Sequence, residues 1–133
     1  MIYLKDSKLK IGSAQEVAKV FLDLLDLEDG IERDKEHFYV MHLDMRCQIK
    51  LVELVSVGTL SSAYVHPRET FRRAVADGAA SIIIAHNHPS GDPDPSEEDT
   101  KVTKLIFEAG QILGISMVDH IIFTKDGYFS FRD

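Results

Sequence analysis

Three segments of the chain place apolar residues at helical spacing. Ser13 and Ser96 are good N-cap residues ahead of the first and third segments, and Pro67 suits the first helical position of the second. The first helix should stop before Gly30 and the second near Gly78. The apolar stripes consist of Val17, Val20, Phe21, Leu24 and Leu25; of Phe71, Ala74 and Val75; and of Val102, Leu105, Ile106, Ala109, Ile112 and Leu113.

Strand-like segments lie between and after the predicted helices. Residues 81–85, Ser-Ile-Ile-Ile-Ala, are apolar and rich in β-branched side chains, which is typical of a central strand buried on both faces. The mixed-charge residues 26–36 predict a solvated connection. The pattern predicts an α/β (α+β) fold, a mixed β-sheet flanked by helices in the order α-β-β-α-β-α-β-β. The expected strands are residues 38–44, 49–57, 81–85, 115–124 and 128–132, with a further short candidate at 63–65.

A pair of histidines follows the predicted central strand. His86 and His88 are two residues apart, so in an extended chain both point to the same side with Cα atoms roughly 6.6 Å apart. Ser96 with Asp99 forms a variant of the capping box, and Asp99 lies one turn before Val102, on the face that packs on the sheet. Two imidazoles and a carboxylate at a strand's C-terminal end complete a protein ligand set for catalytic zinc, with one position left for water.

Composition narrows the classes of function. The net charge of −7 and the lack of a Lys/Arg cluster argue against direct nucleic-acid binding. The single cysteine, Cys47, excludes an internal disulfide and a cysteine-based zinc site, and its polar neighbours predict a turn. No apolar run approaches the ~20 residues of a membrane span, and residues 1–10 lack the apolar segment of a signal peptide, so we expect no membrane segment and a cytoplasmic location.

A hydrolytic metal site also needs a base that takes the proton from the attacking water. Glu36 precedes the first core strand, Glu53 lies within the second, and Glu69 stands in the first turn of a helix. Sequence spacing does not choose among these three glutamates, since each could equally be a surface carboxylate.

Two further residues have a structural and a functional interpretation. Ser96 is expected to cap its helix, and a capping hydroxyl still has its own proton to donate to a developing oxyanion. Strand alternation places Asp119 on one face with Met117 and Ile121, and His120 on the other. A structural hydrogen bond is the favoured role for Asp119, and a second-shell bond to a ligating imidazole is the alternative.

The spacing His86-x-His88, seven residues, then Ser96-x-x-Asp99 resembles the JAMM motif of the JAB/MPN metalloprotease superfamily. The resemblance is closer to its RadC branch, whose members carry the label of DNA repair proteins, and it covers about residues 33–133. The segments that carry the resemblance are Lys35-Glu36-His37-Phe38, Val65-His66-Pro67-Arg68-Glu69, His86-Asn87-His88-Pro89-Ser90-Gly91-Asp92-Pro93 and Asp119-His120. Two residues depart from the pattern of the branch: Lys35 and Ser61 stand where arginine and asparagine are expected.

The resemblance implies a role for each motif residue. His86, His88 and Asp99 would bind Zn²⁺, Ser96 would help to stabilise the tetrahedral intermediate, and Glu36 would activate the water. These roles imply a zinc-dependent hydrolase of peptide or isopeptide bonds that acts on a peptide or protein substrate.

The competing hypothesis is a non-enzymatic, metal-containing binding domain that acts in DNA repair or processing. We expect an N-terminal helical extension and linker at residues 1–32 and the JAB/MPN-like domain at 33–133. Longer members of the branch resemble a helix-hairpin-helix module followed by this domain, and nothing in this sequence matches that module. An exposed edge on the terminal hairpin could pair two chains into a homodimer.

Overall fold

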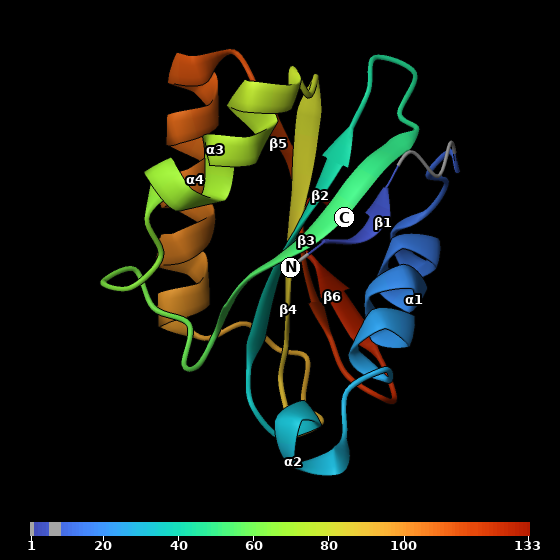
Figure 1. The fold of residues 1–133 in the computed structure, drawn as a ribbon. Coiled ribbons are helices and arrows are strands. Elements are labelled where there is room, and N and C mark those ends of the chain that lie inside the picture. Colours follow the sequence, from blue (N-terminus) through green and yellow to red (C-terminus); the bar gives the residue numbers. More distant parts are fainter. Residues whose placement is uncertain (1, 6–8) are drawn as a thin grey trace.

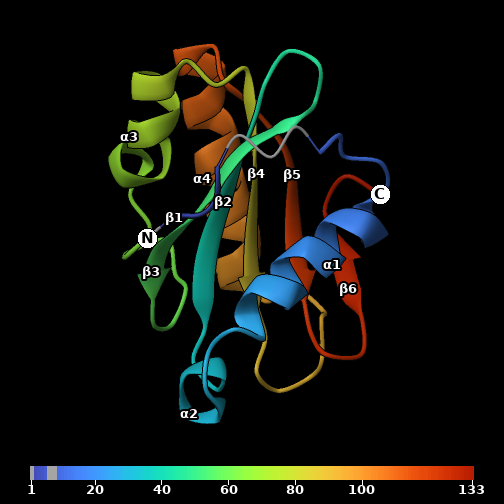
Figure 2. The same cartoon turned by 45° about the vertical axis from the view of Figure 1, so that its right-hand side comes forward.

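The computed structural model describes residues 2–5 and 9–133, in which one mixed sheet lies between two helical layers. The strand order is β1-β3-β2-β4-β5-β6; helix α1 covers one face, and α3 and α4 cover the other (Figures 1 and 2). The strands are β1 (Ile2–Lys5), β2 (His37–Leu43), β3 (Ile49–Val57), β4 (Ser81–Asn87), β5 (Ser116–Phe123) and β6 (Tyr128–Ser130). The helices are α1 (Ala14–Leu25), α2 (Gly30–Arg33), α3 (Pro67–Asp77) and α4 (Glu97–Leu113).

The predicted central position of β4 is confirmed. It pairs antiparallel with β2 and parallel with β5, so its backbone is hydrogen-bonded on both sides. Ile82 and Ile84 pack in the cluster under α3 and α4, whereas Ile83 and Ala85 pack in the cluster under α1. Two helical layers therefore explain why this strand is apolar at every position rather than at alternate ones.

Helix boundaries follow the predicted caps. Ser13 Oγ accepts a hydrogen bond from the Glu16 amide, and at the start of α4 both bonds of the capping box between Ser96 and Asp99 form. Gly78 and Gly114 end α3 and α4 in the left-handed conformation, where a side chain would be strained.

The structure corrects several local predictions. Residues 26–36 contain the short helix α2, begun by the Asp29 side chain, which accepts from the Glu32 amide. Residues 62–64 form a turn, and the short strand expected at 63–65 is absent. Ile112, expected on the apolar stripe of α4, is 87% exposed. The buried face of this helix passes through Ile106 and Gly110 and does not include Ile112. The mixed α/β class and the eight predicted elements are confirmed, and β1 and α2 are additional.

An irregularity in β5 overturns the predicted alternation of that strand. The pairing with β4 shifts by one residue between Met117 and Asp119. Met117 consequently packs under α3 and α4, whereas Ile121 packs under α1. An extra residue in one strand moves the side chains that follow it to the other face.

Two further sequence predictions concern a loop and the surface. Cys47 is exposed in the β2–β3 turn with a φ of 60°, as expected for a turn residue.

Strand β6 lies at one edge of the sheet, and the homodimer expected from this edge stays a prediction. Within residues 2–5 and 9–133, no helix combines the length and apolar character needed to span a bilayer.

Candidate metal centre

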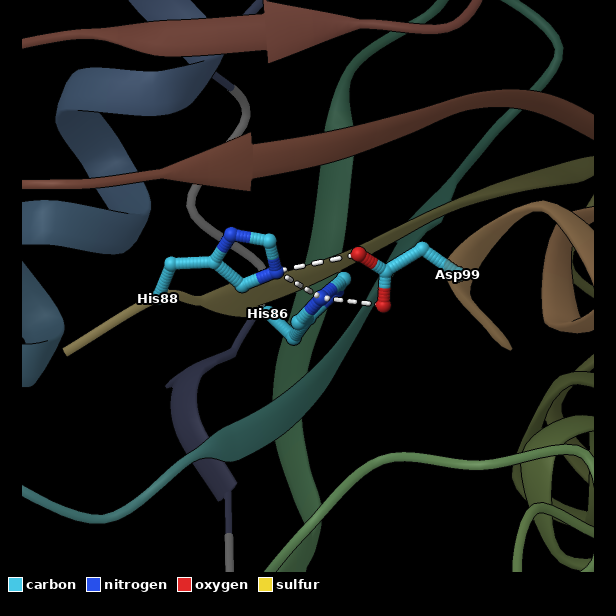
Figure 3. A group of neighbouring side chains, drawn as sticks. All are labelled: His86, His88 and Asp99. Carbon is cyan, nitrogen blue, oxygen red and sulfur yellow. Dashed lines mark hydrogen bonds and ion pairs between the residues drawn. The ribbon is translucent and has the colours of Figure 1, made fainter. Parts of the chain in front are cut away.

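Side chains of His86, His88 and Asp99 meet where β4 ends and α4 begins (Figure 3). His86 Nε2 lies 3.1 Å from His88 Nε2 and 3.0 Å from Asp99 Oδ1, and His88 Nε2 lies 3.0 Å from Asp99 Oδ2. His86 and Asp99 are buried, and His88 is partly exposed. The structure thus brings together the three residues predicted as ligands and leaves solvent access on the His88 side.

The donor set fits a zinc ion. Ligand atoms of a tetrahedral site with bonds of 2.0–2.1 Å lie about 3.3 Å apart, close to the separations found here. Two imidazole nitrogens and a carboxylate that face one another repel through their lone pairs unless a proton or a cation lies among them. Within residues 2–5 and 9–133 no Lys or Arg side chain forms an ion pair with Asp99. Their role as metal ligands stays a prediction that this geometry favours.

One hydrogen bond to the backbone orients His88. Its Nδ1 lies 2.9 Å from the carbonyl oxygen of Asp92. A carbonyl only accepts, so Nδ1 carries the proton and a neutral His88 presents the Nε2 lone pair to the cluster. When Nε2 is protonated as well, its hydrogen bond to Asp99 favours the charged ring, which raises the pKa of His88 above its usual value against the opposing effect of burial.

The carboxylate of Asp99 is held in its ionised form. Burial alone would raise the pKa of Asp99, but its interactions with the His86 and His88 rings and the hydrogen bond from the Ser96 amide outweigh it and hold the pKa well below the usual range. The Ser96 N–H donates to Oδ2 at 2.8 Å. Asp99 therefore remains an anionic, ligand-type oxygen donor throughout the physiological pH range.

Ser96 lies at the rim of the cluster and caps α4 as predicted. Its Oγ accepts from the Asp99 amide at 3.1 Å, and its side chain is exposed. The hydroxyl proton stays available for a substrate oxygen, since capping uses only a lone pair.

Glu36 is the glutamate that lies at the site. Its Oε2 accepts from the Leu60 amide at 2.7 Å, and its charge is close enough to His88 to raise that pKa. The loop that supplies Leu60 is tied to α4 by Ser62, whose amide and hydroxyl donate to the Glu98 carboxylate at 3.0 and 3.1 Å. These bonds fix Glu36 and the first turn of α4 relative to each other.

The other two candidate glutamates lie elsewhere. Glu53 is held within the sheet by His42 Nε2 at 3.1 Å and Arg73 Nε at 3.3 Å. Glu69 is exposed in the first turn of α3. Their contacts leave Glu36 as the one of the three that adjoins the histidine cluster.

Asp119 has the structural role and not the second-shell one. Its carboxylate accepts from Ser130 Oγ at 2.5 Å and from the amides of His120 and Arg132 at 2.7 and 3.0 Å. Among the described residues, the side chain that contacts His86 Nδ1 is that of His120, the residue after Asp119, at 2.9 Å. Burial holds the pKa of His120 well below its usual value, so this ring is neutral.

Asn87 is a positioning residue that sequence reasoning missed. It faces away from the histidines, as expected for the residue between them, and its Oδ1 accepts from the His37 amide at 2.6 Å. Its Nδ2 donates to the Lys35 carbonyl at 3.0 Å. Asn87 thereby ties the segment that carries Glu36 to the end of β4; the pattern His-Asn-His held the signal, but the partners are 50 and 52 residues away.

A cavity of about 630 Å³ borders the exposed side of His88. Apolar side chains from α1 and β5 form part of its wall, and charged side chains of both signs stand at its edge. The residues concerned are Leu22, Leu25 and Phe123 for the apolar part and Asp26, Arg33, Asp34 and Lys125 for the charged part. A ligand side chain could lie here without displacing any part of the cluster.

Comparison with known proteins agrees with the motif. The family described as "RadC-like JAB domain" matches residues 11–133. A "UPF0758 protein" of Pelodictyon phaeoclathratiforme is 42% identical over 131 residues, which is 98% of this chain and 57% of that protein. Its counterpart in Methanosarcina mazei is 41% identical over 131 residues, 98% of this chain and 55% of that one. In Desulforamulus reducens the identity is 47% over 108 residues, 81% of this chain and 48% of the relative. The chain thus spans about half the length of these curated relatives.

Proposed function

The chain belongs to the RadC-like JAB domain family, and from this premise and the donor cluster we propose that it is a zinc-dependent hydrolase of peptide or isopeptide bonds. The observation that carries the proposal is the convergence of His86, His88 and Asp99 beside Glu36. A bound zinc ion supplies Lewis-acid chemistry, which polarises a carbonyl and lowers the pKa of water to about 7.

Glu36 is the proposed general base. One carboxylate oxygen is held by the Leu60 amide, the sole hydrogen-bond donor to this carboxylate among residues 2–5 and 9–133. The other oxygen is left to take a proton from the attacking water and to return it to the departing amine.

Ser96 is the proposed oxyanion donor. Its hydroxyl accepts from the Asp99 amide and so is held at the start of α4. The positive end of the helix dipole and this O–H group both favour negative charge that develops on the substrate carbonyl.

Charge at the rim supports a peptide rather than a nucleic acid as substrate. Asp92, Asp94 and Glu97 are exposed around the loop and helix start that border the cluster. They repel phosphate and attract a basic or neutral peptide. The apolar wall of the cavity beside His88 offers a place for one substrate side chain.

The decisive experiment compares zinc content and amide hydrolysis in wild type, Glu36→Gln and Glu69→Gln. We expect Glu36→Gln to bind zinc as tightly as wild type and to lose at least about 100-fold in kcat, because general-base catalysis contributes 10²–10⁴-fold. Glu69→Gln, a matched change of an exposed glutamate, should retain full activity. Peptide and isopeptide libraries serve as substrates.

Two results would contradict the proposal. Unchanged hydrolysis in Glu36→Gln would remove this residue as the base. Zinc-loaded wild type that cleaves no amide would favour the second hypothesis, a metal-containing binding domain.

A further inference from the structure

The second ring nitrogen of His86 begins a buried hydrogen-bond chain. His86 Nδ1 lies 2.9 Å from His120 Nε2, and His120 Nδ1 lies 2.5 Å from Thr103 Oγ1. Thr103 Oγ1 in turn donates to the backbone carbonyl of Asp99 at 2.8 Å. Both imidazoles are 0% exposed, so water does not substitute for a missing partner. The chain starts at one predicted ligand and ends on the backbone of another.

The number of protons that each group carries determines which group donates in each of these hydrogen bonds. The hydrogen bond to the Asp99 carbonyl uses the one proton of the Thr103 hydroxyl, so Thr103 accepts from His120 Nδ1. A neutral His120 with the proton on Nδ1 has a bare Nε2, which must accept from His86 Nδ1. The proton of His86 then lies on Nδ1, and its Nε2 lone pair points at His88 and Asp99.

His86 and His88 are thus oriented by different means. A backbone carbonyl fixes His88 directly, but His86 meets a second imidazole, whose own proton position depends on Thr103. We propose that His120 and Thr103 are positioning residues that hold His86 as the Nδ1–H tautomer and so present its Nε2 to the metal ion. The inference rests on the metal site of the proposed function and goes beyond it.

If His120 had only a structural role, a variant that keeps its packing but lacks its nitrogens would bind zinc as tightly as wild type. Its ring stacks on Phe131, with centroids 4.9 Å apart and planes at 14°. A His120→Phe variant keeps an aromatic ring for this contact and removes both nitrogens. Thr103→Val removes the hydroxyl at nearly constant shape, and Thr103→Ser restores it.

The test measures zinc affinity by competition with a chromophoric chelator, and histidine tautomers in zinc-loaded protein by ¹⁵N NMR. We expect about 10-fold weaker zinc binding in Thr103→Val, 10–100-fold weaker in His120→Phe, and near wild-type binding in Thr103→Ser, as for other outer-shell partners of metal ligands. Thr70→Val is the matched control: its hydroxyl also donates to the carbonyl four residues earlier, but in α3. In wild type, His120 should carry its proton on Nδ1.

The outcomes separate the two proposals. Zinc affinity unchanged in both Thr103→Val and His120→Phe, or His120 protonated on Nε2 in the zinc-loaded wild type, would overturn the positioning role alone. Wild type that binds no zinc would overturn the proposed function, and the inference with it. Far-UV circular dichroism of each metal-free variant establishes that affinity is compared between folded proteins.

Discussion

Glu53 illustrates how single residues inside this sheet are stabilised by partners far along the chain. Its side chain is 12% exposed and lies against His42 and Arg73. Burial acts to raise the pKa of Glu53, but the hydrogen bonds and charges of His42 and Arg73 outweigh it, so the pKa lies below its usual value of 4.5. This carboxylate therefore favours the folded state when it is ionised.

Replacement of Glu53 by Gln should lower stability in a pH-dependent way. The folded-state pKa is below the unfolded one, so the stabilisation is complete above about pH 4.5 and disappears as the pH falls through the folded value. We expect a loss of about 1 kcal/mol at pH 7, moderate because Arg73 is partly exposed and screened. Urea unfolding from pH 7 to pH 3 measures it, with the exposed Glu108→Gln as control. A difference that grows in acid would refute this assignment.

At the scale of elements, α4 and β5 approach each other closely at Gly110. A Cβ at this position would overlap the carbonyl oxygen of Ile115 and press on the Phe71 ring. The same glycine carbonyl accepts from the amides of Gly114 and Ile115, which end the helix and begin the approach to β5. Since α4 carries Asp99 and Thr103, this contact sets their height above the sheet.

Gly110→Ala should destabilise the protein by about 1–2 kcal/mol. Alanine is intrinsically better than glycine in a helix by about 1 kcal/mol, but overlap with backbone atoms costs more than this gain. The measurement is the free energy of unfolding in urea. Gly30→Ala, where the nearest atom is the end of the Arg33 side chain at 3.8 Å, should leave stability nearly unchanged. Equal stabilities for Gly110→Ala and wild type would show that helix and strand can separate without cost.

At the scale of the whole molecule, the candidate centre joins parts that are distant in sequence. The central strand provides His86 and His88, α4 provides Asp99, and the segment before β2 provides Glu36. A cation bound only by the folded protein therefore stabilises the fold as a whole.

Zinc should raise the thermal unfolding midpoint. At a free concentration about 1,000 times the Kd, the gain is about 4 kcal/mol, or roughly 15 °C for a domain of this size. EDTA should reverse the shift, Asp99→Asn should abolish most of it, and Glu36→Gln should keep it. Differential scanning calorimetry measures each case. An equal shift in Asp99→Asn would place the stabilising ion elsewhere.

The sequence by itself determined the features that depend on short spacing. The His86-x-His88 pair shares a face because strands alternate, and Asp99 faces the sheet because it lies one helical turn before Val102. Caps at Ser13 and Ser96 set two helix starts. The residues in each of these features lie within four positions of each other, so local geometry sets which way their side chains point.

Tertiary structure decided what depends on distant partners. Proximity to His88 distinguishes Glu36 from Glu53 and Glu69. The rings of His86 and His120 are in contact although the two residues are 34 positions apart in the sequence. The one-residue shift in β5 and the buried surface of α4 likewise arise from how neighbouring elements pack. Sequence spacing gives the direction of a side chain within its own element, but only packing brings two elements to a common point.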